Sequence, residues 1–106
     1  MGWVYLAIAG MLEVGFTTAL KYAEGFTKLI PSLCFAAAYI GSAVLLSRAV
    51  ATIPLGTAYA VWTGIGAVGT ALVGIWQFGE PATALRLMFL AVIIGGIIGL
   101  KLVSPA

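Results

Sequence analysis

A single carboxylate, Glu13, lies inside the first long apolar run of this sequence, and its chemistry depends on those surroundings. Of the three acidic residues in the chain, Glu24 and Glu80 lie in polar turns, where a carboxylate is ordinarily solvated. An ionised and unpaired carboxylate in hydrocarbon would cost at least about 2.5 kcal/mol. No Lys or Arg lies within a helical turn of Glu13, so it has no cation of its own on that segment. Such a group suits a site that exchanges protons for a cationic ligand. The alternative is a protonated Glu13 that hydrogen-bonds a neighbouring helix and only stabilises a bundle.

The residues one helical turn from Glu13 indicate what could share a site with it. In a helix, side chains three and four positions away lie on the same face; here they are Ala9, Gly10, Phe16 and Thr17. Phe16 offers a ring face and Thr17 offers a hydroxyl. We therefore expect Gly10, Phe16 and Thr17 to line the pocket around the carboxylate. Close helix packing is an equally open role for Gly10, because glycine also lets two backbones approach.

Aromatic and hydroxyl groups on two later apolar segments could complete the site. Tyr39 and Ser42 are spaced by three in "AAAYIGSAV", and Tyr59, Trp62 and Thr63 share one face in "GTAYAVWTGIG". An aromatic wall beside a carboxylate binds an organic cation through charge and cation–π contact. Tyr59 alone could equally belong to an interfacial aromatic belt. We expect Ser42, Tyr59 and Trp62 to bind substrate with the carboxylate, and Tyr39 and Thr63 to line the pocket.

The composition places these groups in a membrane. The chain has 106 residues, of which 63% are hydrophobic and only 8% are charged, whereas soluble domains carry about 25% charged residues. The basic residues are scattered, so no nucleic-acid surface is expected. With one cysteine, Cys34, and no histidine, no metal site or cofactor is expected either. Soluble enzyme chemistry has no support, because the chain lacks a nucleophile–base pair and a phosphate-binding loop.

Four apolar segments are long enough to cross the bilayer, which takes about 20 residues of helix. The breaks between them hold polar residues, Pro and Gly. The sequence therefore predicts an all-α membrane protein with one transmembrane domain, 1–106. The expected spans are 3–20, 29–49, 56–78 and 84–103.

Glycines mark expected bending and packing positions. Gly64-Ile65-Gly66 places two residues of low helix propensity in the third span, which predicts a hinge. Gly95 and Gly99 form a GxxxG pair in the fourth span. That pair fits a dimer contact, although packing within one chain would use the same pattern.

These features together resemble the small multidrug resistance family of bacterial proton-coupled exporters. The resemblance covers essentially the whole chain. It is carried by "AGMLEV", "LKYAEGFTKLIPS", "IPLGTAYAVWTGIGAVG" and "GIIGLKL". Within the family the chain looks most like the guanidinium-exporter branch, judged by Gly10, the "WTGIGAVG" run and Lys101 after the last glycine.

The resemblance implies an antiparallel, dual-topology homodimer in the bacterial inner membrane, with Glu13 of both subunits facing one site. Guanidinium or a related small cation would compete there with protons. By matching positions, Ser42, Tyr59 and Trp62 would hydrogen-bond or wall the two carboxylates. The segment 64–66 would bend the third helix, and the fourth helix would supply much of the dimer contact.

One position departs from the guanidinium branch. That branch usually has Trp where this chain has Phe16, and Phe lacks the indole N–H. Thr17 and Thr18, which follow it, look more like the branch that exports bulky quaternary ammonium and aromatic drugs. A broad quaternary-ammonium exporter is therefore an alternative. A non-transporting subunit, or one half of a heterodimer, is a second alternative.

The distribution of basic residues predicts insertion in both orientations. Four spans put both termini and the second loop on one side, with Arg48 and Lys101, and leave Lys21, Lys28 and Arg86 on the other. Two basic residues on one side and three on the other are nearly balanced. A protein with one fixed orientation normally has a clear excess of Lys and Arg on the cytoplasmic side. A reporter fused to the C-terminus should therefore be found on both membrane sides. Detection on one side only would contradict this prediction.

Overall fold

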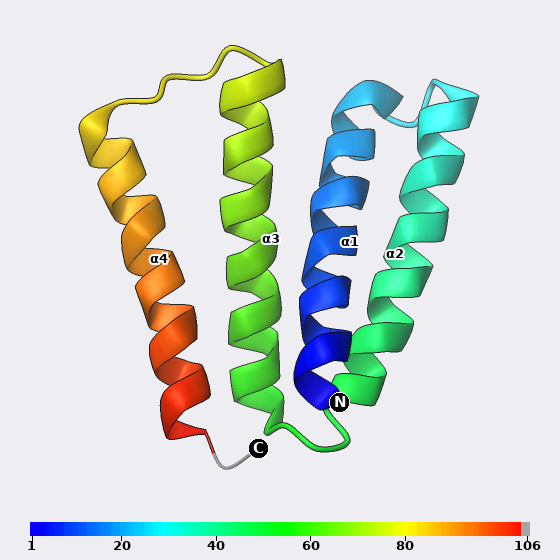
Figure 1. Cartoon of the computed structure of the whole chain (residues 1–106). Coiled ribbons are helices and arrows are strands. Elements are labelled where there is room, and N and C mark those ends of the chain that lie inside the picture. Colours follow the sequence, from blue (N-terminus) through cyan, green and yellow to red (C-terminus); the bar gives the residue numbers. More distant parts are fainter. Residues whose placement is uncertain (105–106) are drawn as a thin grey trace.

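Four α-helices make up most of the computed structural model, which describes residues 1–104 (Figure 1). They are α1 (Gly2–Ala23), α2 (Leu29–Ala49), α3 (Leu55–Gln77) and α4 (Ala84–Val103). Each is long and apolar enough to cross a membrane. The described residues contain no strand. The expected all-α membrane fold with four transmembrane helices is therefore confirmed.

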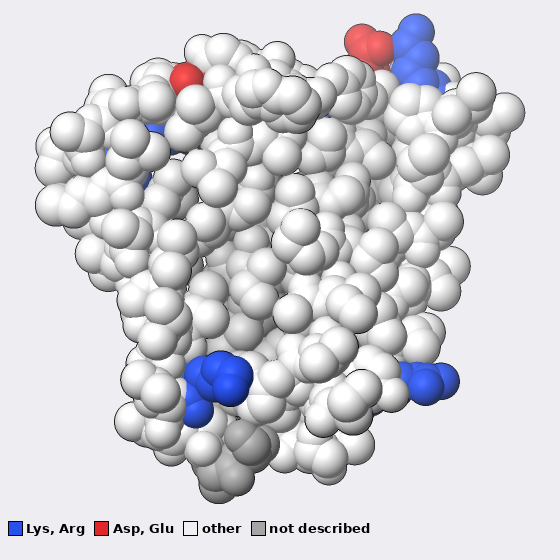
Figure 2. Space-filling model, in the orientation of Figure 1, with Lys and Arg blue, Asp and Glu red and all other residues white. Residues whose placement is uncertain are grey.

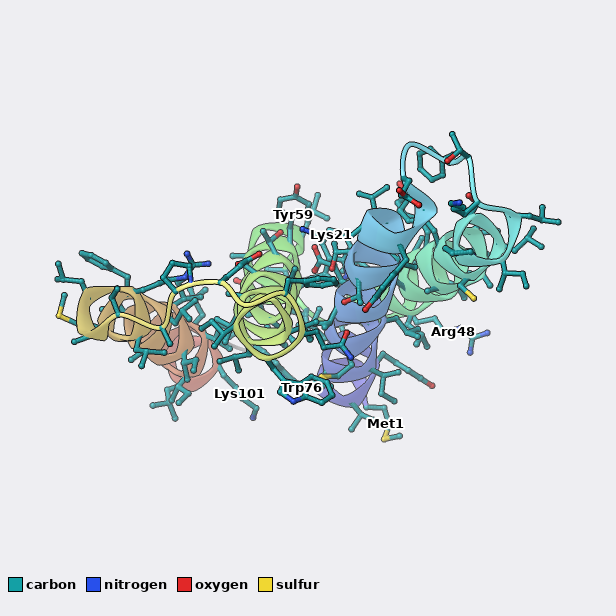
Figure 3. The ribbon with its side chains drawn as sticks, turned by 90° about the horizontal axis from the view of Figure 1, so that it is seen from above. Met1, Lys21, Arg48, Tyr59, Trp76 and Lys101 are labelled. Carbon is teal, nitrogen blue, oxygen red and sulfur yellow. The ribbon has the colours of Figure 1, made fainter. Side chains whose placement is uncertain are left out.

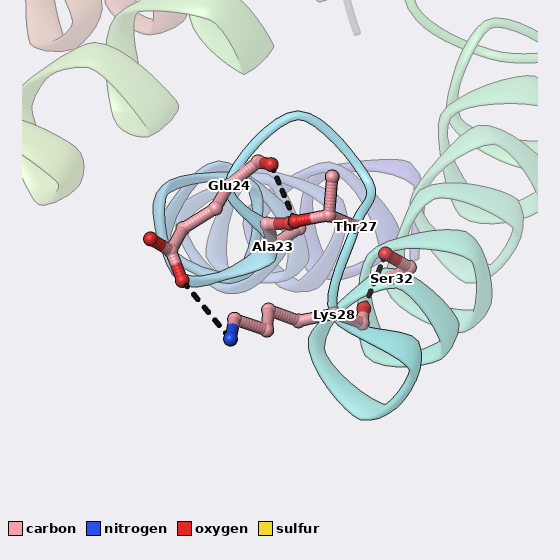
Figure 4. A network of polar contacts seen from close by, with 5 residues as sticks. All are labelled: Ala23, Glu24, Thr27, Lys28 and Ser32. Atoms are coloured by element: carbon pink, nitrogen blue, oxygen red, sulfur yellow. Dashed lines mark hydrogen bonds and ion pairs between the residues drawn. The ribbon is translucent and has the colours of Figure 1, made fainter.

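The first helix is longer than the apolar run that predicted it. Its polar end stays helical to Ala23, because long side chains such as Lys21 can extend toward the membrane surface. The helix stops at Glu24, which has φ 47°, the left-handed conformation typical of a helix C-terminus. The loop is held locally: the Thr27 hydroxyl donates to the Glu24 carbonyl at 2.8 Å, and Lys28 lies 3.8 Å from the Glu24 carboxylate (Figure 4).

The helices form one row, in the order α4, α3, α1, α2 (Figures 1 and 3). The Cα atoms extend over 43 × 35 × 16 Å, so the layer is only one helix thick. The helix α1 packs along both α2 and α3, and α4 packs along α3. No residue of α4 is buried. A single chain therefore leaves both faces of the layer, and most of α4, uncovered.

A cluster of buried hydrophobic residues lies at the end of the layer that holds the N-terminus. Its core comes from the start of α1, the end of α2, the connecting loop and the start of α3; the buried residues are Leu6, Ala49, Ile53, Ala58 and Val61. The Lys101 ammonium also reaches the Trp3 ring, 5.2 Å from its centroid, which ties α4 to α1 at this end. The α1–α2 and α3–α4 loops lie at the opposite end.

Small residues set the close approach of α1 and α3. A Cβ atom added at Gly10 would lie 2.6 Å from Ile65 Cγ2, and one added at Gly69 would overlap the Val14 side chain. Gly10 is buried. Its place in the structure is therefore a close helix contact, which is the packing role left open for it by the sequence.

Charged side chains gather at the two ends of the layer. On the face that Figure 2 shows, no charged side chain is visible in a wide band between the ends. The loop end carries Lys21, Glu24, Lys28, Glu80 and Arg86, and the other end carries Arg48 and Lys101. This distribution suits helices that cross the hydrocarbon and place their charges at its two surfaces.

The contact between Gly10 and Ile65 predicts the effect of adding one methyl group. Gly10→Ala should force α1 and α3 apart and lower the free energy of unfolding by about 1–3 kcal/mol, the usual cost of overpacking. Thermal unfolding of the purified protein in detergent measures it.

Gly15→Ala on the same helix is the matched control, because nothing lies within 4 Å of a Cβ added there. Equal losses of stability in the two variants would contradict the assignment of Gly10 to the α1–α3 contact.

Candidate functional site

An open groove between α1 and α3 contains the intramembrane carboxylate. Its volume is about 380 Å³. The α3 side of the groove is a stripe of small and hydroxyl residues spaced by three and four, as expected for one helix face. The lining residues are Glu13 and Thr17 on α1, Thr63, Gly66, Ala67, Thr70 and Ala71 on α3, and Glu80 in the following loop.

Glu13 lies against the bare backbone of α3. A Cβ atom at Gly66 would overlap its carboxylate, so the absence of a side chain there makes room for it. Glu13 Oε1 is buried and has no hydrogen-bond partner within residues 1–104. Neither ion pair in that part of the chain includes Glu13. A buried acceptor without a partner is costly, so this oxygen is suited to take a proton or a cationic donor.

Two threonine hydroxyls meet across the groove beside Glu13. Thr17 Oγ1 and Thr70 Oγ1 are 2.6 Å apart. Thr17 Oγ1 also lies 2.9 Å from the Glu13 carbonyl oxygen, to which it donates. Thr70 was not expected as a site residue. Thr70 lies four residues after Gly66 and therefore on the same helix face, which could have pointed to it. The same spacing is equally typical of helix packing, so it does not by itself identify a groove wall.

Ser42 joins three helices from a fully buried position. Its hydroxyl donates to the Ala9 carbonyl of α1 at 2.7 Å and accepts a hydrogen bond from the Trp62 indole of α3 at 2.9 Å. Since the single hydroxyl proton is used on Ala9, Ser42 does not donate to Glu13 in this arrangement. The structure pairs Ser42 with Trp62, and the role of these two residues in substrate binding stays a prediction.

Two of the residues expected to line the pocket lie instead between α1 and α2. Phe16 is only 8% exposed and packs edge-on against Phe35 and Tyr39, with centroid distances of 5.5 and 5.3 Å. Phe16 and Tyr39 are therefore absent from the groove lining of the single chain, as is Gly10. Their role in binding stays a prediction.

Tyr59 projects out of the layer, on the same side as Lys21 and opposite Trp76 (Figure 3). It is 57% exposed, and its ring lies 5.7 Å from the Trp62 ring. Thr63, one turn further along α3, lines the groove. This helix face thus carries an aromatic pair close to the wall of the groove.

The expected hinge residues lie in a continuous stretch of α3 and face three different neighbours. Gly64 faces Ile97 of α4, Ile65 fills the space beside Gly10, and Gly66 faces the carboxylate of Glu13. A bend at this segment would therefore disturb all three contacts at once. Hinge motion itself stays a prediction.

The two glycines of the expected dimer contact are open. Nothing lies within 4 Å of a Cβ atom added at Gly95 or Gly99. Their role in a dimer stays a prediction.

Glu80 is less solvated than its position in a turn suggests. It lines the same groove as Glu13, and its Oε1 accepts a hydrogen bond from the Arg86 guanidinium at 2.9 Å. The sequence could not show this, because the path of the α3–α4 loop decides it.

Comparison with known proteins identifies related membrane transporters. The family described as Small Multidrug Resistance protein matches residues 1–93. A guanidinium exporter of Citrobacter freundii is 57% identical over 102 residues, which cover 96% of this chain and 97% of that protein. A guanidinium exporter of Proteus vulgaris is 55% identical over 104 residues, 98% of this chain and 100% of that protein. With its four apolar helices, the chain is therefore a multi-pass membrane transporter and not an enzyme, located in the inner membrane in bacteria, and it belongs to the Small Multidrug Resistance family.

Proposed function

We propose that this protein is a proton-coupled antiporter that exports guanidinium or related small guanidinyl cations. The observation that carries the proposal is the buried, unpaired Oε1 of Glu13 in an open groove. The names of the relatives, which are more than half identical over nearly the whole chain, support the choice of cation. The proton and the cation use the same carboxylate and therefore exclude each other.

The chemistry of the groove suits a small planar cation. Guanidinium presents parallel N–H donors that match the two oxygens of a carboxylate, and such charge-assisted hydrogen bonds are stronger than neutral ones. The hydroxyl of Thr63 lines the same groove and can accept a remaining N–H. When a proton occupies Glu13, the attraction for the cation is lost, and the cation is released.

We propose that two copies form the functional unit. One layer encloses the groove incompletely and leaves α4 uncovered, with Gly95 and Gly99 open to close approach by another helix. The nearly equal basic charge at the two ends favours an antiparallel pair. A second layer on the face that carries Tyr59 would bring two Glu13 carboxylates and both aromatic pairs to one site. A bend at 64–66 would then open this site to alternate sides.

Replacing the carboxylate by its amide tests the mechanism. Glu13→Gln keeps the shape but cannot ionise, and we expect guanidinium binding to weaken by about tenfold to a hundredfold, the loss of one hydrogen-bonded charge pair. Proton-coupled guanidinium uptake into proteoliposomes should disappear. Glu24→Gln is the control, because Glu24 lies in the α1–α2 loop outside the groove. Proton-coupled uptake that persists in Glu13→Gln would refute the carboxylate mechanism.

Acidity and substrate are varied in the same assay. Since protons compete for Glu13, apparent guanidinium affinity should fall as pH is lowered, by up to about tenfold per pH unit for each carboxylate that must lose a proton. An apparent guanidinium affinity that does not change with pH across the neutral range would contradict proton competition.

Tetraethylammonium serves as the bulky comparison cation. Transport of tetraethylammonium but not of guanidinium would replace the guanidinium assignment with the quaternary-ammonium one.

The buried hydrogen bonds of Ser42 predict a separate effect. Ser42→Ala leaves the Trp62 indole N–H without its acceptor, which should cost about 1–3 kcal/mol of stability. It should also weaken guanidinium binding if Trp62 walls the site. Ser32→Ala is the matched control on α2, since its hydroxyl donates only to the Lys28 carbonyl near the surface. Unchanged stability and affinity in Ser42→Ala would show that this network is dispensable.

A further inference from the structure

A second carboxylate faces the groove of Glu13. Gly66 faces Glu13 on α3, and Gly74 faces Glu80. These glycines are eight residues apart on one helix, which corresponds to about 12 Å. Glu80 therefore lines the end of the groove that is nearer the α3–α4 loop.

The backbone holds Glu80 in this place. Gly79, with φ 65°, turns the chain back after α3, and the Glu80 N–H donates to the Gly74 carbonyl at 3.1 Å. A Cβ atom at Gly74 would meet the Glu80 carboxylate, so this glycine lets it lie against the helix. The carboxylate is consequently positioned by α3 rather than free in solvent.

A guanidinium group already lies on this carboxylate. Arg86 donates to Glu80 Oε1 at 2.9 Å, and the two side chains are 39% and 40% exposed. Arg86 is fixed in the first turn of α4, where its backbone N–H donates to the Thr83 hydroxyl. The protein thus carries, at the loop end of the groove, the same guanidinium group that the transported cation would carry. An ion pair as exposed as this one contributes little to stability, so another cation can replace Arg86 at low cost.

The charges around this end of the groove give Glu80 an electrostatic role in cation entry. The Lys21 ammonium lies 4.7 Å from the centroid of the Phe78 ring, close to the end of α3. Lys21 and Arg86 are both cationic, and Glu80 is the acid between the loop and the groove. Without Glu80, the positive charges of Lys21 and Arg86 would repel an approaching cation.

We propose that Glu80 is an outer binding site for guanidinium-type cations, at which the cation displaces the Arg86 guanidinium before or after it occupies Glu13. The inference rests on the proposed function and adds a second site to it. The path between the sites passes the hydroxyls of Thr17 and Thr70, which line the groove. Binding at Glu80 is weak and confined to this end of the groove. It therefore affects how readily the cation enters. The exchange of cation for protons takes place at Glu13.

Opposite shifts in KM test the proposal in proteoliposomes. Glu80→Gln should raise the KM for guanidinium about fivefold to tenfold, the loss of a partly exposed charge-assisted hydrogen bond, and change the maximal rate less. Arg86→Gln frees Glu80 from its internal competitor and should lower KM. Glu24→Gln is matched to Glu80→Gln: it removes the same charge at the same end of the layer, from an acid paired with Lys28.

A binding measurement separates the two sites. Equilibrium dialysis of radiolabelled guanidinium against purified Glu13→Gln protein should retain a weak site, and the double variant with Glu80→Gln should lose it. Retention of that weak binding in the double variant would overturn the outer site, as would equal KM values in Glu80→Gln and Glu24→Gln, or a higher KM in Arg86→Gln. Failure of the proposed function is distinct: Glu13→Gln would then transport like the parent, whatever the Glu80 variants do.

Discussion

The unpaired carboxylate of Glu13 against the backbone of α3 is the constraint on which the rest of this structure depends. Carrying an acid into hydrocarbon costs at least about 2.5 kcal/mol if it is ionised and alone. The structure offers it no permanent cation, and at Gly66 it removes the side chain that would fill the same space. The carboxylate is thereby held in a defined position while its charge remains uncompensated, which is what a site for exchangeable cations requires.

A buried cluster at one end of the layer supports the helices around Glu13. Near the N-terminus, Leu6, Ile53 and Val61 bury a compact cluster that holds α1, α2 and α3 together. Toward the loop end, α1 and α3 border a groove lined by small residues and hydroxyls, and contacts such as the Tyr22–Gln77 hydrogen bond at 3.2 Å still join the two helices. Ser42 fastens all three helices between these regions without using the carboxylate. The buried cluster therefore supports the helices that form the groove.

The thinness of the layer explains why a second copy is part of the proposed mechanism. A row of helices 16 Å thick has no interior that could seal a transport pathway from both sides. The exposed Tyr59 ring and the open glycines of α4 lie on surfaces that a single chain leaves uncovered. Opposed pairing of two such layers would enclose the carboxylates and would put one Glu80–Arg86 pair at each membrane surface. The outer and inner acids would then form a series along each route of entry.

The sequence alone was sufficient for the helices, the membrane and the central acid, because these depend on local properties. Long apolar runs with polar breaks specify transmembrane helices, and a carboxylate inside such a run is conspicuous, as at Glu13. Spacing by three and four also identified Thr17 and Thr63 as neighbours of the groove.

The tertiary structure decided which helix or loop each side chain contacts, because residue spacing along one helix does not determine that. Phe16 shares a helix face with Glu13 in the sequence, yet it packs toward α2, because a face about 100° wide can contact two different helices. Thr70 and Glu80 entered the groove only through the pairing of α1 with α3 and the turn at Gly79, and these depend on contacts between residues far apart in the chain.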